Sequence, residues 1–237
     1  LHGKAYLIPA DGQIEVATDI PADYKDAYED ALGVLAGAAA EGDDDLLVKF
    51  IDEGELTQEE IISGLKIAVS NNRIVPSFAG CPEKNSGLVP LLDFISEITP
   101  DPSQMIETAE NEFGDISTVK ISPEEATSIL CIKTANDQFS GKLSYLKVIT
   151  GTLSTDTELF NITEKKKEKI GKIYRCTGKK LEEVKSVSAG DIVIATKLAI
   201  TKTSDTLSAN QETIPFVRLR HPEPVYSIAV SAQDKRN

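Results

Sequence analysis

Eight basic residues gather between positions 165 and 180, where they could contact an anionic partner: Lys165, Lys166, Lys167, Lys169, Lys172, Arg175, Lys179 and Lys180. Positive groups at this density neutralise nucleic-acid phosphates and release counterions, so the run predicts an RNA contact. Four carboxylates interrupt it: Glu164, Glu168, Glu182 and Glu183. A solvated, self-paired hairpin is the alternative, because lysines also keep sheet edges from pairing with other chains. The residues leave both interpretations open.

Patterns for catalysis or metal binding are sparse. The two histidines, His2 and His221, lie near opposite ends of the chain and give little support to a histidine triad or metal cluster. The carboxylates at 43–45 lack the spacing of a calcium loop, and we expect them at a solvated helix N-terminus. The cysteines, at 81, 131 and 176, lack metal-ligand spacing and are expected to be reduced thiols.

The chain contains no phosphate-binding Gly-x-x-x-x-Gly-Lys-Ser/Thr sequence. Such a loop holds phosphates through its backbone amides and lysine, and its hydroxyl helps to bind Mg²⁺. We therefore expect this chain neither to bind nor to hydrolyse a nucleoside triphosphate appreciably. No catalytic residue, metal ligand or cofactor is predicted in it.

Short strands are the elements that would position the basic run. Residues 141–150 alternate with a period of two between Gly141 and Gly151, which is typical of a packed strand. Gly190 supplies a turn into a second strand at 192–196. Similar short strands recur as far as Phe216 without a helical pattern. This predicts an all-β barrel over 119–220.

The first hundred residues predict an α+β arrangement. Strands at 3–8 and 13–18 are joined by an expected turn at 9–12. Thr57 and Glu60 have the spacing of a capping box at the start of a helix. The other expected elements are helices over 20–40, 44–51 and 88–98, and a buried strand over 73–78.

Two stretches suggest how the chain is divided. Residues 101–118 are acidic and contain prolines, so we interpret them as the connection between domains. Residues 225–231 predict a strand with no later strand to pair with, and the chain begins abruptly with a strand at residue 3. Because natural proteins cover unpaired strand edges, we expect an internal piece of a longer polypeptide.

Several phrases of the chain resemble elongation factor G and its paralogues among the translational GTPases: residues 41–47, 54–57, 87–93, 141–153, 189–191 and 204–207. The resemblance implies an inserted subdomain of a GTPase domain at 1–73, the last strand and helix of that domain at 74–100, a linker at 101–118, the second-domain barrel at 119–220 and a truncated first strand of a third domain at 221–237. The implied fold class is α+β and multidomain. A partial α/β GTPase piece with its insertion precedes an all-β translation-factor barrel.

The resemblance also implies a function for a full-length parent, which would couple GTP hydrolysis, with Mg²⁺, to movement on the ribosome in the cytoplasm. Gly80, Cys81 and Pro82 align with the family's Gly-Ser-Ala loop, which touches guanine through backbone amides. Cys81 and Pro82 depart from that pattern, and proline has no amide hydrogen to donate. The family's guanine-selecting Asn-Lys-x-Asp is absent. Asp156 and Thr157 stand where the family has Gly-Asp, which predicts a different turn.

Charge is distributed unevenly along the chain, whose net charge is −13. Residues 1–120 hold 7 Lys and Arg against 24 Asp and Glu, whereas residues 121–237 hold 18 against 14. A mildly basic barrel can dock on ribosomal RNA while the acidic part stays solvated. No apolar run reaches the roughly 20 residues of a membrane span, and we expect no leader peptide, no membrane partner and a monomer. The alternative function is a non-catalytic adaptor whose barrel binds protein.

Overall fold

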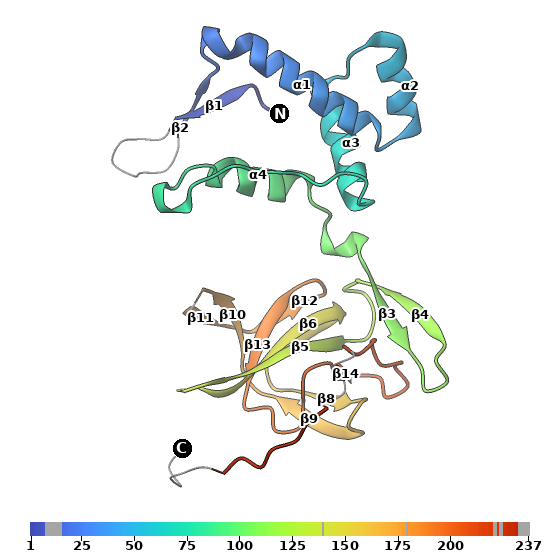
Figure 1. Ribbon diagram of the computed structural model, residues 1–237. Helices are drawn as coiled ribbons and strands as arrows, with labels where there is room; N and C mark the ends of the chain where they lie inside the picture. The colour runs from blue at the N-terminus through green and yellow to red at the C-terminus, as the bar shows by residue number, and fades with distance from the viewer. Residues whose placement is uncertain (8–15, 139, 179, 220–221, 223–224, 232–237) are drawn as a thin grey trace. The chain divides into compact units, whose positions relative to one another are not determined.

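The chain forms two compact units, Leu1–Asp101 and Pro102–Asn237. The computed structural model describes residues 1–7, 16–138, 140–178, 180–219, 222 and 225–231 (Figure 1). The first unit combines a two-stranded ribbon with helices, and the described part of the second is almost entirely β-structure. The predicted fold class, an α+β piece followed by a β-barrel, is confirmed.

Four α-helices build the first unit: α1 (Lys25–Ala40), α2 (Asp44–Glu53), α3 (Gln58–Ser70) and α4 (Leu88–Ile98). A 3-10 turn at Ala22–Tyr24 leads into α1. Strands β1 (Lys4–Leu7) and β2 (Val16–Asp19) pair antiparallel, while the turn expected at 9–12 lies outside the described residues.

The starts of α2 and α3 follow from their capping residues. The Asp43 side chain accepts hydrogen bonds from the amides of Asp45 and Leu46, at 3.0 and 3.2 Å. At α3 the capping box is confirmed: the Thr57 hydroxyl accepts from the Glu60 amide, and the Glu60 carboxylate accepts from the Thr57 amide at 2.8 Å. Each cap satisfies amides that have no partner inside the helix.

Close approach between α1 and α3 gives the first unit its core. A Cβ atom at Gly64 would lie 2.3 Å from the Ala39 carbonyl oxygen, so only glycine allows the helices to meet there. Around this crossing the fully buried apolar residues pack: Ala36, Ala39, Ile61, Leu65 and Ile98. The core is small, because α1 contributes mainly alanine.

The buried strand predicted over 73–78 is wrong. The segment carries no strand pairing, and Val75 is 88% exposed and Phe78 46% exposed. A strand is stable only when its backbone groups pair with a neighbour, and Pro76 removes one donor. Phe78 instead packs edge-on against Phe94 of α4, with ring centroids 5.0 Å apart.

An eight-stranded antiparallel sheet forms the main part of the second unit, in the order β11-β10-β13-β6-β5-β14-β8-β9. These strands are β5 (Ser128–Asp137), β6 (Gly141–Thr150), β8 (Thr157–Asn161), β9 (Lys166–Ile170), β10 (Ile173–Thr177), β11 (Lys180–Val184), β13 (Ile192–Thr196) and β14 (Thr206–Ser208). A short pair, β7 (Thr152–Ser154) with β12 (Ser186–Ser188), lies beside them.

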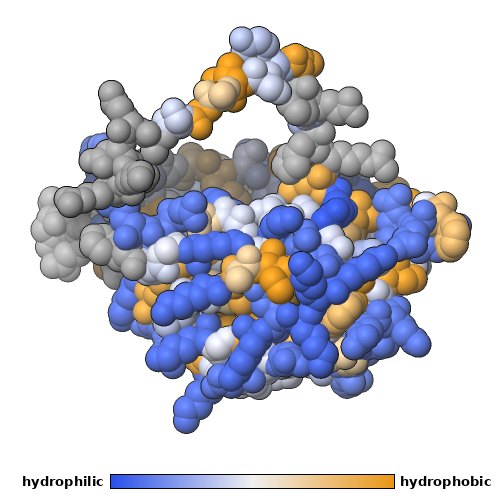
Figure 2. Space-filling view, turned by 90° about the horizontal axis from the view of Figure 1, so that it is seen from below, coloured by the Kyte–Doolittle hydropathy of each residue, from blue (hydrophilic) through white to orange (hydrophobic). Residues whose placement is uncertain are grey.

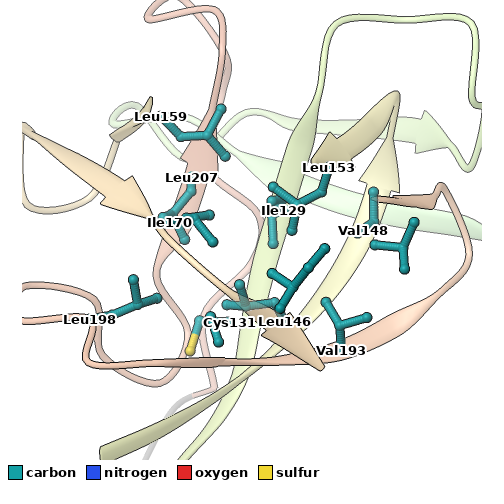
Figure 3. Packing of buried hydrophobic residues seen from close by; sticks show 13 residues of the cluster. Ile129, Cys131, Leu146, Val148, Leu153, Leu159, Ile170, Val193, Leu198 and Leu207 are labelled. Atoms are coloured by element: carbon teal, nitrogen blue, oxygen red, sulfur yellow. The ribbon is translucent and has the colours of Figure 1, made fainter. Parts of the chain in front are cut away.

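The sheet curls around a single apolar core, which makes it a barrel. Along β6 the side chains of Leu146 and Val148 point inward, and they meet Ile129 and Cys131 of β5, Ile170 of β9 and Leu207 of β14 (Figure 3). Alternate residues of each strand therefore share one interior, as the period of two predicts. Because β11 and β9 are the ends of the strand order, they are its two edge strands.

The linker predicted over 101–118 is wrong. Strands β3 (Ile106–Glu110) and β4 (Ile116–Lys120) form a hairpin within the second unit. Ala109, Ile121, Ile149 and Phe216 bury each other in a second small core, and the Val217 amide bonds the Thr108 carbonyl at 2.9 Å. Acidic composition alone suggested a linker, whereas Ala109 of β3 and Val119 of β4 pack into this second core.

The strand predicted over 225–231 is also wrong. The described residues there form no strand, and Val225 and Val230 are 100% and 87% exposed. The apolar alternation favours a strand, but these residues pair with no neighbouring described segment, and a strand needs such pairing.

Candidate nucleic-acid interface

The basic run lies on two hairpins, β8–β9 and β10–β11, at opposite ends of the strand order. On β9, Glu168 and Ile170 face the interior, so Lys167 and Lys169 face solvent. Lys165 lies in the turn before β9, Lys172 between β9 and β10, Arg175 on β10 and Lys180 on β11. Lys179 lies outside the described residues. The structure therefore distributes the predicted patch over two hairpins, and Lys169 and Lys172 line one groove with residues of the β10–β11 hairpin.

Six of the predicted cations form surface ion pairs: Lys165 with Glu112 (3.4 Å), Lys167 with Glu158 (2.9 Å), Lys169 with Asp156 (2.9 Å), Lys172 with Glu183 (2.8 Å), Arg175 with Asp191 (3.1 Å) and Lys180 with Glu182 (2.6 Å). Within the described part of the chain, Lys166 has no ion-pair partner. The six paired cationic side chains are more than half exposed, and such pairs contribute little stability. They can exchange a carboxylate for a phosphate at small cost.

Seen from below, the β8–β9 end of the barrel is largely hydrophilic, with scattered apolar residues between long polar side chains (Figure 2). Of the interrupting carboxylates, Glu182 and Glu183 pair with the lysines, and Glu164 pairs with Lys202 at 2.8 Å. The fourth, Glu168, is 7% exposed and points into the barrel. It does not reduce the positive charge of the outer surface as the sequence suggested.

In two of these pairs the hydrogen bond shifts a pKa value in the direction that favours the charged form. The carboxylate of Glu183 raises the pKa of Lys172, with a smaller contribution from Tyr174. Similarly, Glu164 raises the pKa of Lys202, and Lys202 lowers the pKa of Glu164. The ammonium groups of Lys172 and Lys202 thus stay charged throughout the neutral range.

A buried polar network fixes the segment between β13 and β14. The Glu168 carboxylate accepts from the amides of Ile200 and Thr201, at 2.8 and 2.9 Å, and from the Thr201 hydroxyl. Asp205, with no exposed surface, accepts from the Asn161 amide group at 3.0 Å and from Arg218 at 3.1 Å. This network was not predicted from the sequence. A signal for Glu168 was present, because it occupies the same side of the β9 alternation as the apolar Ile170.

The predicted guanine loop has most of its amides committed internally. Cys81 and Ser86 exchange two backbone hydrogen bonds, of 2.9 and 3.0 Å, around a 3-10 turn at Pro82–Lys84. The amides of Lys84 and Asn85 bond the carbonyls of Cys81 and Pro82. Together with the missing amide hydrogen of Pro82, this arrangement leaves few donors for a base.

The turn with Asp156 and Thr157 has the backbone that glycine favours. Asp156 has a φ of 59°, and its amide bonds the Gly171 carbonyl at 2.9 Å. Aspartate tolerates this left-handed conformation better than most residues. The turn is also where Asp156 meets Lys169.

Other chemistry is limited in the described residues. His2 bonds Glu97 at 2.8 Å and Gln58 at 3.0 Å, on the first unit's surface, and His221 lies outside the described part. Among the described residues, no three metal-ligating side chains gather as a metal site would require. No described helix has the length and apolarity needed to cross a membrane.

The second unit is thus a β-barrel that carries lysines near both of its edge strands. Residues 126–210 match the family model described as elongation factor G domain 2. This part of the barrel is therefore similar to elongation factor G domain 2, and the resemblance noted in the sequence is confirmed.

A solved structure agrees over nearly the whole chain. A crystal structure of a protein from Thermus thermophilus superposes with a TM-score of 0.71 and 25% identity, covering 93% of this chain. The match covers 31% of the Thermus chain, so this chain spans about a third of that protein's length. The chain therefore combines a barrel similar to an elongation factor domain, within residues 102–237, with an acidic helical unit at residues 1–101.

Proposed function

We propose that this chain docks a translation elongation factor on the ribosome, with the barrel contacting ribosomal RNA. The observation that carries the proposal is the placement of exposed lysines on both edge hairpins of an elongation factor G domain 2. In this account the parent works in the cytoplasm and couples GTP hydrolysis, with Mg²⁺, to movement on the ribosome. The chain itself contributes the docking surface.

Titration of small-subunit ribosomal RNA with the 237-residue chain tests this function. Three phosphate contacts to single-stranded RNA would give a slope of about −2 for log affinity against log salt between about 50 and 200 mM. A double variant with Lys166→Gln and Lys167→Gln, which removes two positive charges, should make this salt dependence less steep. Lys25→Gln combined with Lys66→Gln removes the same charge from the acidic unit and should leave the slope unchanged.

We further propose that GTP binding belongs to the parent and not to this chain. The sequence has no phosphate-binding loop, and the amides of Cys81, Lys84, Asn85 and Ser86 are bonded within their own loop. Calorimetric titration with GDP should release no binding heat. Clear saturable heat would overturn this part of the account.

A protein-binding adaptor is the competing function. The ion pairs that cover the basic hairpins suit a solvated surface as well as an RNA surface. An absence of RNA affinity at low salt, with the barrel folded, would favour the adaptor.

A further inference from the structure

A groove of about 560 Å³ opens between the β10–β11 hairpin and the turns beside β9. Its lining includes three lysines, one carboxylate, one aromatic ring and one apolar side chain: Asp156, Lys169, Lys172, Tyr174, Leu181 and Lys197. This volume lies within the range of small-ligand sites, roughly 300 to 1,000 Å³. The groove shares Lys169 and Lys172 with the basic run, whereas Tyr174 and Lys197 belong to no motif in the sequence.

The charge of the groove is positive although the whole chain is acidic. Three lysines face one lining carboxylate, Asp156, and Glu183 holds Lys172 from the rim. The pairs of Lys169 with Asp156 and Lys172 with Glu183 have side chains at least half exposed, so their attraction is weakened by solvent. Within the described part of the chain, Lys197 has no ion-pair partner. An entering phosphate therefore meets one unpaired lysine and two lysines held by weak pairs.

Tyr174 gives the groove a flat apolar side. It lies on β10 opposite Glu183 of β11 and Ile194 of β13, and the neighbouring Ile173 takes the inward position in the barrel core. Tyr174 is therefore on the outer face, partly buried, with Leu181 also lining the groove. Aromatic faces bind unpaired bases by stacking, largely without regard to sequence.

The backbone around Lys197 is firmly held. Lys197 has a φ of 63°, its amide bonds the Lys142 carbonyl at 3.2 Å, and the next residue, Leu198, is in the barrel core. The Lys142 ammonium in turn donates to the Thr201 carbonyl at 2.6 Å. Residues in this left-handed region persist only when the surroundings enforce them, so the structure fixes the backbone position from which the Lys197 side chain extends.

We propose that this groove binds one nucleotide of an unpaired RNA strand, with its base stacked on Tyr174 and its phosphates near Lys169, Lys172 and Lys197. The inference rests on the proposed function, since it names the form of RNA that the barrel takes. It differs from that function in requiring an unpaired base and not only a phosphate backbone.

Anisotropy of a fluorescein-labelled eight-nucleotide RNA, titrated with the 237-residue chain, tests the groove. Tyr174→Ala should weaken binding about tenfold, the loss of one stacked base, while Tyr174→Phe keeps the affinity. Lys197→Gln should reduce the steepness of the salt dependence by about 0.7, one phosphate contact. Lys120→Gln, an exposed lysine on β4, is the matched control and should bind like the wild type. Circular dichroism verifies that each variant is folded.

An abasic strand of the same length separates stacking from charge. It should bind the wild type about as weakly as the normal RNA binds Tyr174→Ala. Equal affinity for abasic and normal strands, or wild-type affinity in Tyr174→Ala, would overturn the proposal. Full displacement of the RNA by an equal nucleotide concentration of AMP would also overturn it, because it would indicate a site for free nucleotides.

Binding to small ribosomal subunits, measured with the same variants, distinguishes this inference from the proposed function. The docking function would stand and the groove would be rejected if subunit binding were lost in the Lys166 and Lys167 double variant but unchanged in Tyr174→Ala. The groove would stand and the docking function would be rejected if the short RNA bound in a Tyr174-dependent way while the chain bound no subunits.

Discussion

The carboxylate of Glu168 accepts a hydrogen bond from the backbone amide of Thr201 at 2.9 Å, inside the barrel and 33 residues away along the chain. The same carboxylate accepts from the Ile200 amide at 2.8 Å. An acidic residue of the basic hairpin thereby anchors the segment that follows Lys197. Through Glu168, the strand that carries the outer lysines of β9 is hydrogen-bonded to the segment that follows Lys197.

Removal of this anchor should destabilise the barrel strongly. Glu168→Ala leaves the buried amide and hydroxyl of Thr201 and the partly buried amide of Ile200 without their acceptor, so we expect a loss of about 3 kcal/mol in the free energy of unfolding. Hydrogen exchange of peptides from β6 measures the loss within the barrel. Glu182→Ala, which removes an exposed pair on β11, serves as the control and should change little. Equal protection in both variants would refute the role of Glu168.

Gly151 should tolerate substitution far less than Gly141 and Gly171. It has a φ of 70°, and an added Cβ would lie 2.7 Å from the Thr127 backbone, so we expect Gly151→Ala to destabilise by more than about 2 kcal/mol. Gly141 has a φ of 71° but open space, and Gly141→Ala should cost about 1 kcal/mol. Gly171→Ala meets neither obstacle and should be nearly neutral. Chemical unfolding of the three variants ranks them.

The helical unit should lose stability in acid through Glu60. Lys49 and the Thr57 cap lower the pKa of Glu60 from 4.5 to about 2. Because the folded-state pKa is depressed, the contribution is present above pH 4.5 and disappears as the pH falls toward about 2.

Glu60→Gln should accordingly lower the thermal midpoint of the helices at neutral pH and flatten its decline across that pH window. Circular dichroism melts at several pH values measure both effects. Glu59→Gln, a neighbouring exposed carboxylate, should keep the wild-type profile. An unchanged slope in Glu60→Gln would contradict the assignment.

Alkylation should separate the three thiols. Burial raises the pKa of Cys131 to about 11, and its side chain is in the barrel core, so it should stay unmodified in the folded chain. Cys176 is exposed on β10 and should react first, with the half-buried Cys81 between them. Mass spectrometry after brief iodoacetamide treatment at mildly alkaline pH gives the order. Early modification of Cys131 would show that the barrel opens readily.

The sequence predicted best the elements whose signals are local. The capping box of Thr57 and Glu60, the alternation along β6 and the barrel itself need only neighbouring residues to be recognised. Three predicted elements failed because they depend on distant partners. Residues 73–78 and 225–231 have apolar alternation without a paired neighbour, and the supposed linker at 101–118 is a hairpin packed on Ile149 and Phe216.

The sequence predicted which basic residues belong to the candidate interface, but not where those residues lie relative to one another. Lysine spacing identified the hairpins, but only strand order shows that β9 and β11 are opposite edges. Tyr174 and Lys197 lie 23 positions apart in the sequence, and they line the same groove because β10 pairs with β13. No periodicity in the sequence carries that information.

Co-sedimentation with small ribosomal subunits at low salt tests the central claim most directly. The wild-type chain should pellet with the subunits, and Lys166→Glu combined with Lys167→Glu should stay in the supernatant. Lys25→Glu with Lys66→Glu, which changes the net charge equally in the acidic unit, should pellet like the wild type. Equal binding of all three proteins, or no binding of the folded wild type, would contradict docking through the barrel's basic edge.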